Sequence, residues 1–220
     1  VILGAYTTTE DSTGDIVETY EVSVTQPQVT EVLQSFVGLY EQIPPMYSAI
    51  KINGVRLYEL ARKNIVVDRP KRQVKILEIS QISPLNENRF KIKVECSKGT
   101  YIRTLCTDIG RKLNCGAHMG ELLRTKVGNF TIDNSVTLAE LEKSNPLDLL
   151  ISIESLFKDY KKIVINESLT KSLYNGNQLD YANYDAQEEF VRVYDYLDNF
   201  VGIYRTAPDK LIVEKMFRGV

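Results

Sequence analysis

The chain has few residues of the kinds that build disulfide or metal sites. Its 220 residues include three cysteines, Cys96, Cys106 and Cys115, and one histidine, His118. An odd cysteine count without CxxC spacing argues against a disulfide framework and against a zinc site. One histidine excludes a site built from several histidines of a single chain. We therefore expect reduced thiols, no bound metal and a cytoplasmic protein.

Long apolar runs are missing as well. No segment has the roughly 20 apolar residues that cross a bilayer, and no secretory signal is visible. Hydrophobic residues make up 43% of the chain and charged residues 25%, which is ordinary for a globular protein. The length suffices for one large domain, or for a large and a small one.

Positive charge is absent from the first part of the chain. Residues 1–50 contain no Lys or Arg and seven acidic residues, whereas residues 51–126 contain seventeen basic and seven acidic residues, a net +10. The whole chain carries a net charge of −2. A basic middle inside an acidic protein favours a localised polyanion-binding face over charge scattered on solvated surfaces.

The stretch from Cys96 to Thr104 reads as a strand that ends in a glycine turn and leads into a helix. Tyr101 and Arg103 lie at that junction. The guanidinium fork binds carboxylate or phosphate through paired contacts, and the Tyr ring can stack on a base. Taken alone, this pair is better explained as a Tyr packed at a strand end and an Arg on a solvated helix face.

The periodicity of apolar residues predicts a chain of alternating short elements. A helix is expected to begin at Thr30 as N-cap. The expected strands are 3–9, 16–24, 73–82, 89–96, 162–166, 190–194, 200–204 and 211–213, and the expected helices are 30–37, 57–62, 101–113, 138–142 and 146–157. Residues 86–88 would join the strands on either side of them as a turn.

Residues 40–70 are predicted to form a long insertion that carries aromatic and basic side chains. Pro44-Pro45 forbids helix and imposes an extended turn, and Asn53-Gly54 predicts a tight turn. Loops of this length tend to be functional, although a packed surface excursion is the simpler alternative.

Three ordered groups of residues together resemble the bacterial TruB-type family of T-loop tRNA pseudouridine synthases. They are Leu3-Gly4 with Thr7, Thr9, Asp11 and Gly14; Gln42 to Lys51 with Gly54, Leu57-Tyr58 and Ala61-Arg62; and Ser97 to Thr104 with Asp108, Gly110, Gly116-Ala117-His118, Leu122, Arg124-Thr125, Gly128 and Phe130. Each group is weak by itself, and their order and spacing along residues 1–140 make the set specific.

The resemblance implies an α+β fold of the pseudouridine-synthase kind, with a mixed, mainly antiparallel sheet and flanking helices. It assigns residues 1–150 to a catalytic domain that is incomplete at its N-terminus. Residues 40–70 would be its thumb-like RNA-binding insertion. Residues 160–220 would be a small β-rich PUA-like domain.

The implied activity is isomerisation of uridine 55 in the T-loop of tRNA to pseudouridine. The N-glycosidic bond breaks, the base rotates, and a C-glycosidic bond forms after the target base has flipped out of its stack. The resemblance implies no cofactor, tRNA as the partner, no membrane and a monomeric protein.

The resemblance also assigns site residues. Tyr101 would stack on the flipped base, Arg103 would hold the catalytic aspartate ionised, and Leu122 would close the pocket. Asp11 and His118 are expected to give structural support. The expected RNA contacts are Tyr47, Lys51, Arg56, Arg62, Lys98 and Arg124.

The family's Gly-Thr-Leu-Asp-Pro motif, which carries its catalytic aspartate, is absent from the 220 residues. Because the chain starts at Val1-Ile2-Leu3 without a methionine, we expect that motif upstream and expect this chain alone to be inactive. Asp11 and Asp108 lack the motif's context and are not expected to replace the nucleophile. Leu123 stands where many relatives carry Arg.

Two other functions remain open at this level. The chain could be a non-catalytic tRNA-binding or RNA-folding module that uses the insertion and the C-terminal part. It could also be an α+β domain without a nucleic-acid role, which the +10 window and the three motifs disfavour.

Overall fold

A computed structural model describes residues 1–180 and 188–217. The chain divides into two compact units, Val1–Leu123 and Arg124–Val220. The expected boundary between residues 150 and 160 stays a prediction. Within the described residues, no helix is both long and apolar enough to cross a membrane.

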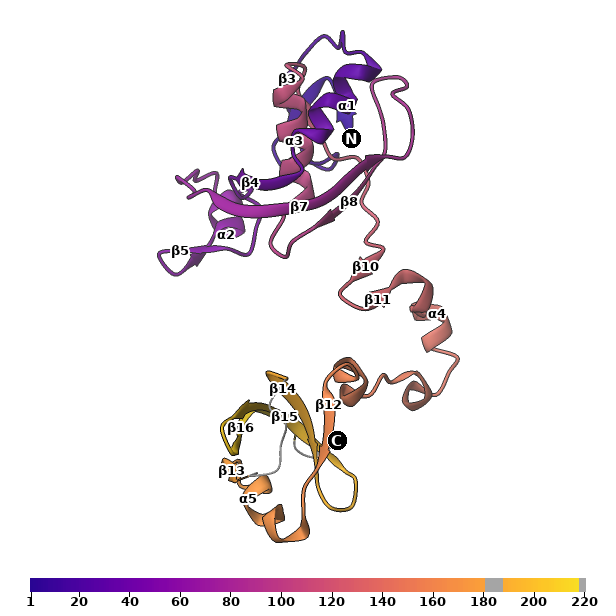
Figure 1. The fold of residues 1–220 in the computed structure, drawn as a ribbon. Helices are drawn as coiled ribbons and strands as arrows, with labels where there is room; N and C mark the ends of the chain where they lie inside the picture. Colours follow the sequence, from indigo (N-terminus) through magenta and orange to yellow (C-terminus); the bar gives the residue numbers. More distant parts are fainter. Residues whose placement is uncertain (181–187, 218–220) are drawn as a thin grey trace. The chain divides into compact units, whose positions relative to one another are not determined.

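The first unit is built on a three-stranded antiparallel sheet of order β4-β7-β8 (Figure 1). The strands are β4 (Gly38–Gln42), β7 (Arg72–Gln81) and β8 (Ile92–Cys96). The expected strands over 73–82 and 89–96 are thus confirmed as an antiparallel pair. The chain reverses between them at residues 86–89, where the backbone groups of Asn86 and Arg89 bond each other.

Two helices, α1 (Gln26–Gln34) and α3 (Ile102–Lys112), supply most of the helical part of the core. Val29 and Leu33 of α1, Ile76 of β7, and Leu105 and Ile109 of α3 are almost fully buried in one cluster. Burial of an aliphatic side chain of this size contributes roughly 1.5–3 kcal/mol, so this cluster holds the helices against the sheet.

The first helix begins earlier than expected, and the prediction of Thr30 as its N-cap is wrong. Thr25 is the N-cap, and the Gln28 side chain accepts hydrogen bonds from the Thr25 N–H and hydroxyl, both at 2.8 Å. Pro27 suits the first turn because its missing N–H needs no partner there. Thr30 lies inside the helix, with its hydroxyl on the Gln26 carbonyl at 3.2 Å.

The expected strand over 3–9 is split into β1 (Ile2–Leu3) and β2 (Ala5–Thr7). Gly4 separates them because its φ of +100° breaks the extended chain. β1 pairs with β9 (Ala117–His118), and β2 pairs with β3 (Ile16–Thr19) as the predicted hairpin. The loop of that hairpin carries Asp11.

The thumb-like insertion lies between two neighbouring strands, because β4 and β7 pair directly from Gly38↔Ile76 to Gln42↔Arg72. It contains a short hairpin of β5 (Lys51–Ile52) and β6 (Val55–Arg56), followed by α2 (Leu57–Ala61). The turn at Asn53-Gly54 is confirmed, with φ of +50° and +84°. In Figure 1 the insertion projects from the end of the β4–β7 pair.

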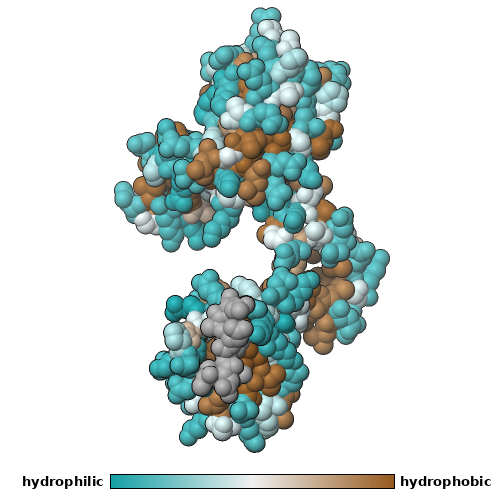
Figure 2. All heavy atoms as spheres, viewed as in Figure 1, coloured by the Kyte–Doolittle hydropathy of each residue, from teal (hydrophilic) through white to brown (hydrophobic). Residues whose placement is uncertain are grey.

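The second unit starts with a run of short elements that bury little. These are β10 (Lys126–Val127), β11 (Phe130–Thr131), η1 (Ile132–Asn134), α4 (Leu138–Leu141), η2 (Pro146–Leu149) and η3 (Ile153–Phe157). The helix expected over 146–157 is two separate 3₁₀ segments. Leu138, Leu147 and Leu150 are more than 70% exposed, and apolar side chains gather on this part of the surface (Figure 2).

The rest of the second unit is a five-stranded sheet of order β12-β14-β15-β16-β13. Its strands are β12 (Lys161–Val164), β13 (Leu179–Asp180), β14 (Phe190–Tyr194), β15 (Phe200–Ala207) and β16 (Lys210–Met216), with η4 (Glu167–Leu169) and α5 (Thr170–Tyr174) beside them. Only the β12–β14 pair is parallel among the described strands.

This sheet confirms the predicted small β-rich part, and the two units together confirm the α+β class with mainly antiparallel strands. Residues 181–187 and 218–220 of the predicted PUA-like range lie outside the described residues. A buried cluster that includes Ile165, Val191 and Leu211 forms its core.

We expect Gly110→Ala to destabilise the first unit by about 3 kcal/mol, because a Cβ there would lie 2.2 Å from the Ala117 nitrogen. Gly54→Ala is the control. Its Cβ would meet nothing within 4 Å, so only the backbone strain of its φ of +84° remains, which costs about 1 kcal/mol. Urea unfolding measures both, and equal losses would contradict the steric explanation.

Candidate active site and RNA-binding surface

The junction between β8 and α3 places Tyr101 and Arg103 as the sequence predicted. After Cys96 the chain turns at Ser97–Thr100, where Gly99 has a φ of +85° and the Thr100 hydroxyl donates to the Ser97 carbonyl at 2.9 Å. Tyr101 is the N-cap of α3, with no side-chain cap bond. Arg103 therefore lies in the first turn of the helix, next to the tyrosine.

The Arg103 guanidinium joins three parts of the first unit. Its Nη1 donates to Asp11 Oδ2 at 3.3 Å and to the Thr9 carbonyl at 3.4 Å, and its Nη2 donates to the Tyr47 carbonyl at 2.8 Å. The side chains of Arg103 and Asp11 are 25% and 15% exposed. Arg103 thus ties the β2–β3 loop and the thumb-like insertion to α3.

Asp11 is held as a carboxylate by a full set of donors. Its Oδ1 accepts from the Thr9 hydroxyl at 2.7 Å, the Thr13 N–H at 3.0 Å and the Thr13 hydroxyl at 2.5 Å. Partial burial acts to raise the pKa of Asp11, but these hydrogen bonds and the Arg103 charge outweigh it and lower the pKa below its usual value. Both oxygens of Asp11 are thus engaged by partners within the first unit, and its supporting role stays a prediction.

Glu10 is a partly buried carboxyl that the sequence did not mark as a site residue. Its backbone has a φ of +64°, and its Oε2 accepts from the Thr104 hydroxyl at 2.5 Å. Burial raises the pKa of Glu10, against the opposing Thr104 hydrogen bond. The left-handed φ of Glu10, next to Asp11, is unusual for a residue other than glycine. No pattern in the sequence indicates it, so it is visible only in the folded backbone.

Two further polar side chains reach α3 from β4. The Gln42 amide bonds both backbone groups of Tyr101, and the Tyr40 hydroxyl donates to the Asp108 carboxylate. The pKa of Tyr40 is raised, chiefly by burial of the hydroxyl and to a smaller extent by its hydrogen bond to Asp108. Arg111 also binds Asp108, at 2.6 Å. Asp108 is thereby engaged on both oxygens.

The other expected site residues are more dispersed. His118 is buried in β9, and its Nδ1 lies 3.0 Å from the Ala5 carbonyl, which fits structural support. Leu122 is 53% exposed near the end of the first unit, and Lys98 is exposed in the turn before Tyr101. Arg124 is exposed and belongs to the second unit.

Three of the expected RNA contacts gather around a tyrosine in the thumb-like insertion. Arg56 donates to the Tyr58 hydroxyl at 2.8 Å, and the guanidiniums of Arg56 and Arg62 lie 5.8 and 5.4 Å from its ring centroid. Lys51 pairs with Arg56 across the β5–β6 hairpin. We call Lys51, Arg56, Tyr58 and Arg62 the insertion cluster, which presents positive charge around an aromatic ring.

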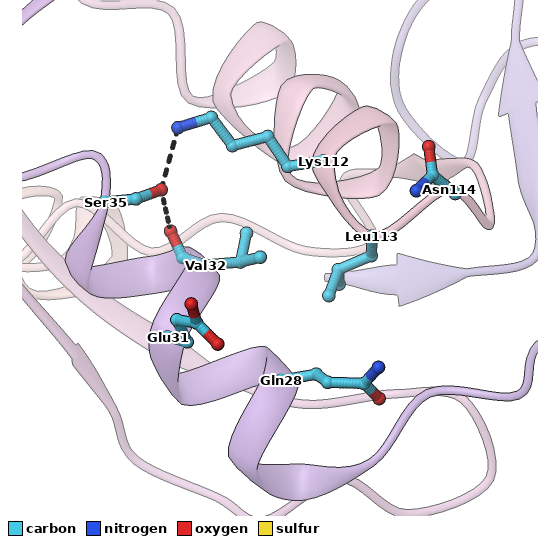
Figure 3. A pocket seen from close by; sticks show the side chains of 7 residues that line it. All are labelled: Gln28, Glu31, Val32, Ser35, Lys112, Leu113 and Asn114. Carbon is cyan, nitrogen blue, oxygen red and sulfur yellow. Dashed lines mark hydrogen bonds between the residues drawn. The ribbon is translucent and has the colours of Figure 1, made fainter.

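A cavity of about 390 Å³ lies elsewhere, between α1 and the last turn of α3 (Figure 3). Lys112 is nine residues beyond Arg103, which is about 14 Å along a helix. Lys112 is engaged there by the Ser35 hydroxyl at 2.7 Å and the Phe36 ring at 4.2 Å. The other residues that line the cavity are Gln28, Glu31, Val32, Leu113 and Asn114. None of the predicted site residues lines this cavity.

The part of the chain that the structure describes contains no group of three or more His, Cys, Asp or Glu side chains arranged to hold a metal ion.

We expect Asp11→Asn to lower the stability of the first unit at neutral pH by about 1 kcal/mol, because it removes the charge that pairs with Arg103. The folded pKa of Asp11 is depressed, so the wild-type advantage is complete above the ordinary value of 3.8. It shrinks as the pH falls further, through the folded pKa. Urea unfolding of both proteins from pH 7 to pH 3 measures the difference in their free energies of unfolding. The contribution of Glu10 is the same in both proteins and drops out of this difference. A difference that grows towards acid would contradict this.

Two family models match the chain in succession. The first, TruB family pseudouridylate synthase (N terminal domain), matches residues 1–102, and the second, tRNA pseudouridylate synthase B C-terminal domain, matches residues 103–149. The match begins in β1 and ends before the C-terminal sheet.

Curated relatives extend the similarity over almost the whole chain. The tRNA pseudouridine synthase B of Oceanobacillus iheyensis is 44% identical over 215 residues, covering 94% of this chain and 71% of the relative. The protein of the same name from Staphylococcus aureus (strain Newman) is 41% identical over 224 residues, covering 96% and 73%.

Solved structures show the same fold. A Cbf5-Nop10-Gar1 complex aligns with a TM-score of 0.63 at 22% identity, over 90% of this chain and 63% of that chain. An H/ACA RNP bound to a substrate RNA containing 2′-deoxyuridine aligns with a TM-score of 0.61 at 20% identity, over 91% and 63%. The chain thus spans a little under two thirds of these structures. Together, the two family models and the curated relatives place this chain in the TruB family of pseudouridylate synthases.

Proposed function

We propose that this protein isomerises uridine 55 in the T-loop of tRNA to pseudouridine, as a cytoplasmic monomer without a metal or organic cofactor. Membership of the TruB family and the names of the curated relatives support tRNA pseudouridine synthesis as the reaction class. The observation that carries the proposal is the Arg103 guanidinium, anchored at three points beside Tyr101.

The reaction needs a carboxylate that stays ionised in a closed pocket. Either it attacks covalently or it stabilises and deprotonates while the N-glycosidic bond breaks and the C-glycosidic bond forms. A buried carboxylate neutralises unless a cation holds it, and Arg is suited because it keeps its proton. Among the described residues, the contacts of Arg103 use only Nη1 and Nη2, and a guanidinium has five N–H donors. It can therefore hold a second carboxylate.

Tyr101 would stack on the flipped uracil and restore part of the stacking free energy lost when the base leaves the loop. Leu122 would close the pocket over the base. Tyr47 is half-buried, and its carbonyl already binds Arg103, so an RNA contact by its side chain would act next to the site.

The nucleophilic aspartate is proposed to lie outside residues 1–220. The family's Gly-Thr-Leu-Asp-Pro motif does not occur among them. Asp11 and Asp108, the two carboxylates considered as replacements for the nucleophile, are engaged by hydrogen bonds and by Arg103 or Arg111. On this basis we expect residues 1–220 alone to bind tRNA without turning it over.

A second function, tRNA binding or RNA folding without catalysis, is favoured by the insertion cluster. Two arginines close to the ring of a half-buried tyrosine suit a phosphate backbone and an unstacked base, independent of any nucleophile. Lys98 and Arg124 are the other proposed phosphate contacts.

Tritium release from unmodified tRNA labelled at C5 of uridine tests the synthase. The full-length gene product should release tritium, and Arg103→Ala should reduce the rate by about 10³-fold, because the cation that holds the carboxylate is lost. Arg111→Ala, at the far end of α3, is the matched control and should keep most of the activity.

Residues 1–220 alone should bind the same tRNA and release no tritium. Turnover by that chain, lost in Asp11→Asn or Asp108→Asn, would overturn the placement of the nucleophile. Binding without turnover by the full-length product would favour the non-catalytic function, and mapping of the modified position tests the assignment to uridine 55.

We expect Arg62→Ala to weaken tRNA binding and to lower the slope of log K against log salt by about 1, because one phosphate contact is removed. Arg62→Lys keeps the charge and loses the planar stack on Tyr58, so its salt slope should match that of the wild type. Filter binding between 50 and 200 mM salt measures both. An unchanged slope in Arg62→Ala would remove Arg62 from the RNA surface.

A further inference from the structure

The backbone of Tyr101 is held by a side chain from the neighbouring strand. Gln42 Oε1 accepts the Tyr101 N–H at 2.8 Å, and Gln42 Nε2 donates to the Tyr101 carbonyl at 3.0 Å. The same carbonyl accepts the Leu105 N–H at 3.0 Å as the first bond of α3. Both polar groups of the Tyr101 main chain are therefore engaged, and Gln42 supplies one partner for each.

The surroundings make this contact hard to replace. Gln42 is 1% exposed, and among the residues described the N-cap of α3 has no side-chain cap of its own. A primary amide both donates and accepts, whereas an ionised Glu only accepts, and an apolar side chain does neither. A buried backbone N–H without a partner is costly, so removing the amide favours a shift of the tyrosine backbone.

Gln42 also occupies a particular place in the chain. It is the last residue of β4, within the first residues of the thumb-like insertion, and its Nε2 reaches the Tyr40 hydroxyl at 3.4 Å. Tyr40 in turn binds Asp108, further along α3. β4 is therefore joined to α3 at two places, at the helix N-cap Tyr101 and in the middle of the helix at Asp108.

We infer that Gln42 is a positioning residue for the uracil-stacking ring of Tyr101, setting the ring's place from the strand that leads into the insertion. The inference rests on the proposed function for the role of Tyr101. Gln42 is buried and would act through the tyrosine main chain. Misplacing a reacting group by about 1 Å can cost about 10²-fold in rate, which sets the scale expected here.

The test compares Gln42→Met with the wild type in the full-length protein, by single- and multiple-turnover tritium release from tRNA. We expect kcat to fall by about 10- to 100-fold, while KM and the tRNA Kd change by less than about threefold. Gln73→Met is the control. It makes the same substitution at an exposed position of β7, opposite Glu41, and should leave all three constants unchanged.

A double-mutant cycle separates positioning from a general loss of structure. In a Tyr101→Ala background, Gln42→Met should cause less than about a twofold further loss, because no ring remains to be positioned. Additive losses, or a rise in KM with kcat intact, would overturn the inference. If Gln42→Met fails to fold, Gln42→Glu, which keeps the acceptor for the Tyr101 N–H, replaces it, with a smaller expected loss of kcat.

Amide hydrogen exchange distinguishes failure of this inference from failure of the proposed function. Gln42→Met should lose protection in the peptide that contains Tyr101, with α1 unchanged. Absence of turnover in the wild type would refute the proposed function and, with it, any catalytic meaning of the contact. Turnover in the wild type with unchanged exchange and unchanged kcat in Gln42→Met would refute the positioning role alone.

Discussion

The joint made by Arg103 is the interaction on which the candidate site depends. One guanidinium bonds the β2–β3 loop through Thr9 and Asp11 and the thumb-like insertion through the Tyr47 carbonyl, while its own backbone begins α3. Three segments far apart in the sequence therefore meet at one charge. The fixed donor geometry of Arg is what permits this, because a lysine cannot present several donors in one plane.

Charge and burial around that joint are balanced by neighbours. Asp11 is kept ionised by two threonines and Arg103, whereas burial shifts the pKa of Glu10, the preceding residue, upwards. The pKa values of two adjacent carboxyls are thus shifted in opposite directions. The difference arises because Asp11 receives hydrogen bonds from several donors, while burial outweighs the Thr104 hydrogen bond at Glu10.

The sheet gives the site its second support. β4 and β7 are neighbours in space but are separated in the chain by the thumb-like insertion, so the strand that enters the insertion also lies beside α3. Gln42 and Tyr40 use that position to hold Tyr101 and Asp108. The insertion cluster and the Tyr101–Arg103 junction are in this way connected within the first unit by the chain and by hydrogen bonds.

The sequence by itself determined the elements, the Asn53-Gly54 turn, the Tyr101–Arg103 junction and the family, because periodicity, turn residues and ordered motifs are local properties. It missed the Thr25 cap, since Thr25 and Thr30 are both of a residue type that favours N-caps, and it read two 3₁₀ segments as one helix. Only the tertiary structure decided the partners of Arg103, the burial of Glu10 and the grip of Gln42 on Tyr101. Those contacts join residues 56 to 94 positions apart, and no local pattern encodes which distant donor reaches a buried backbone group.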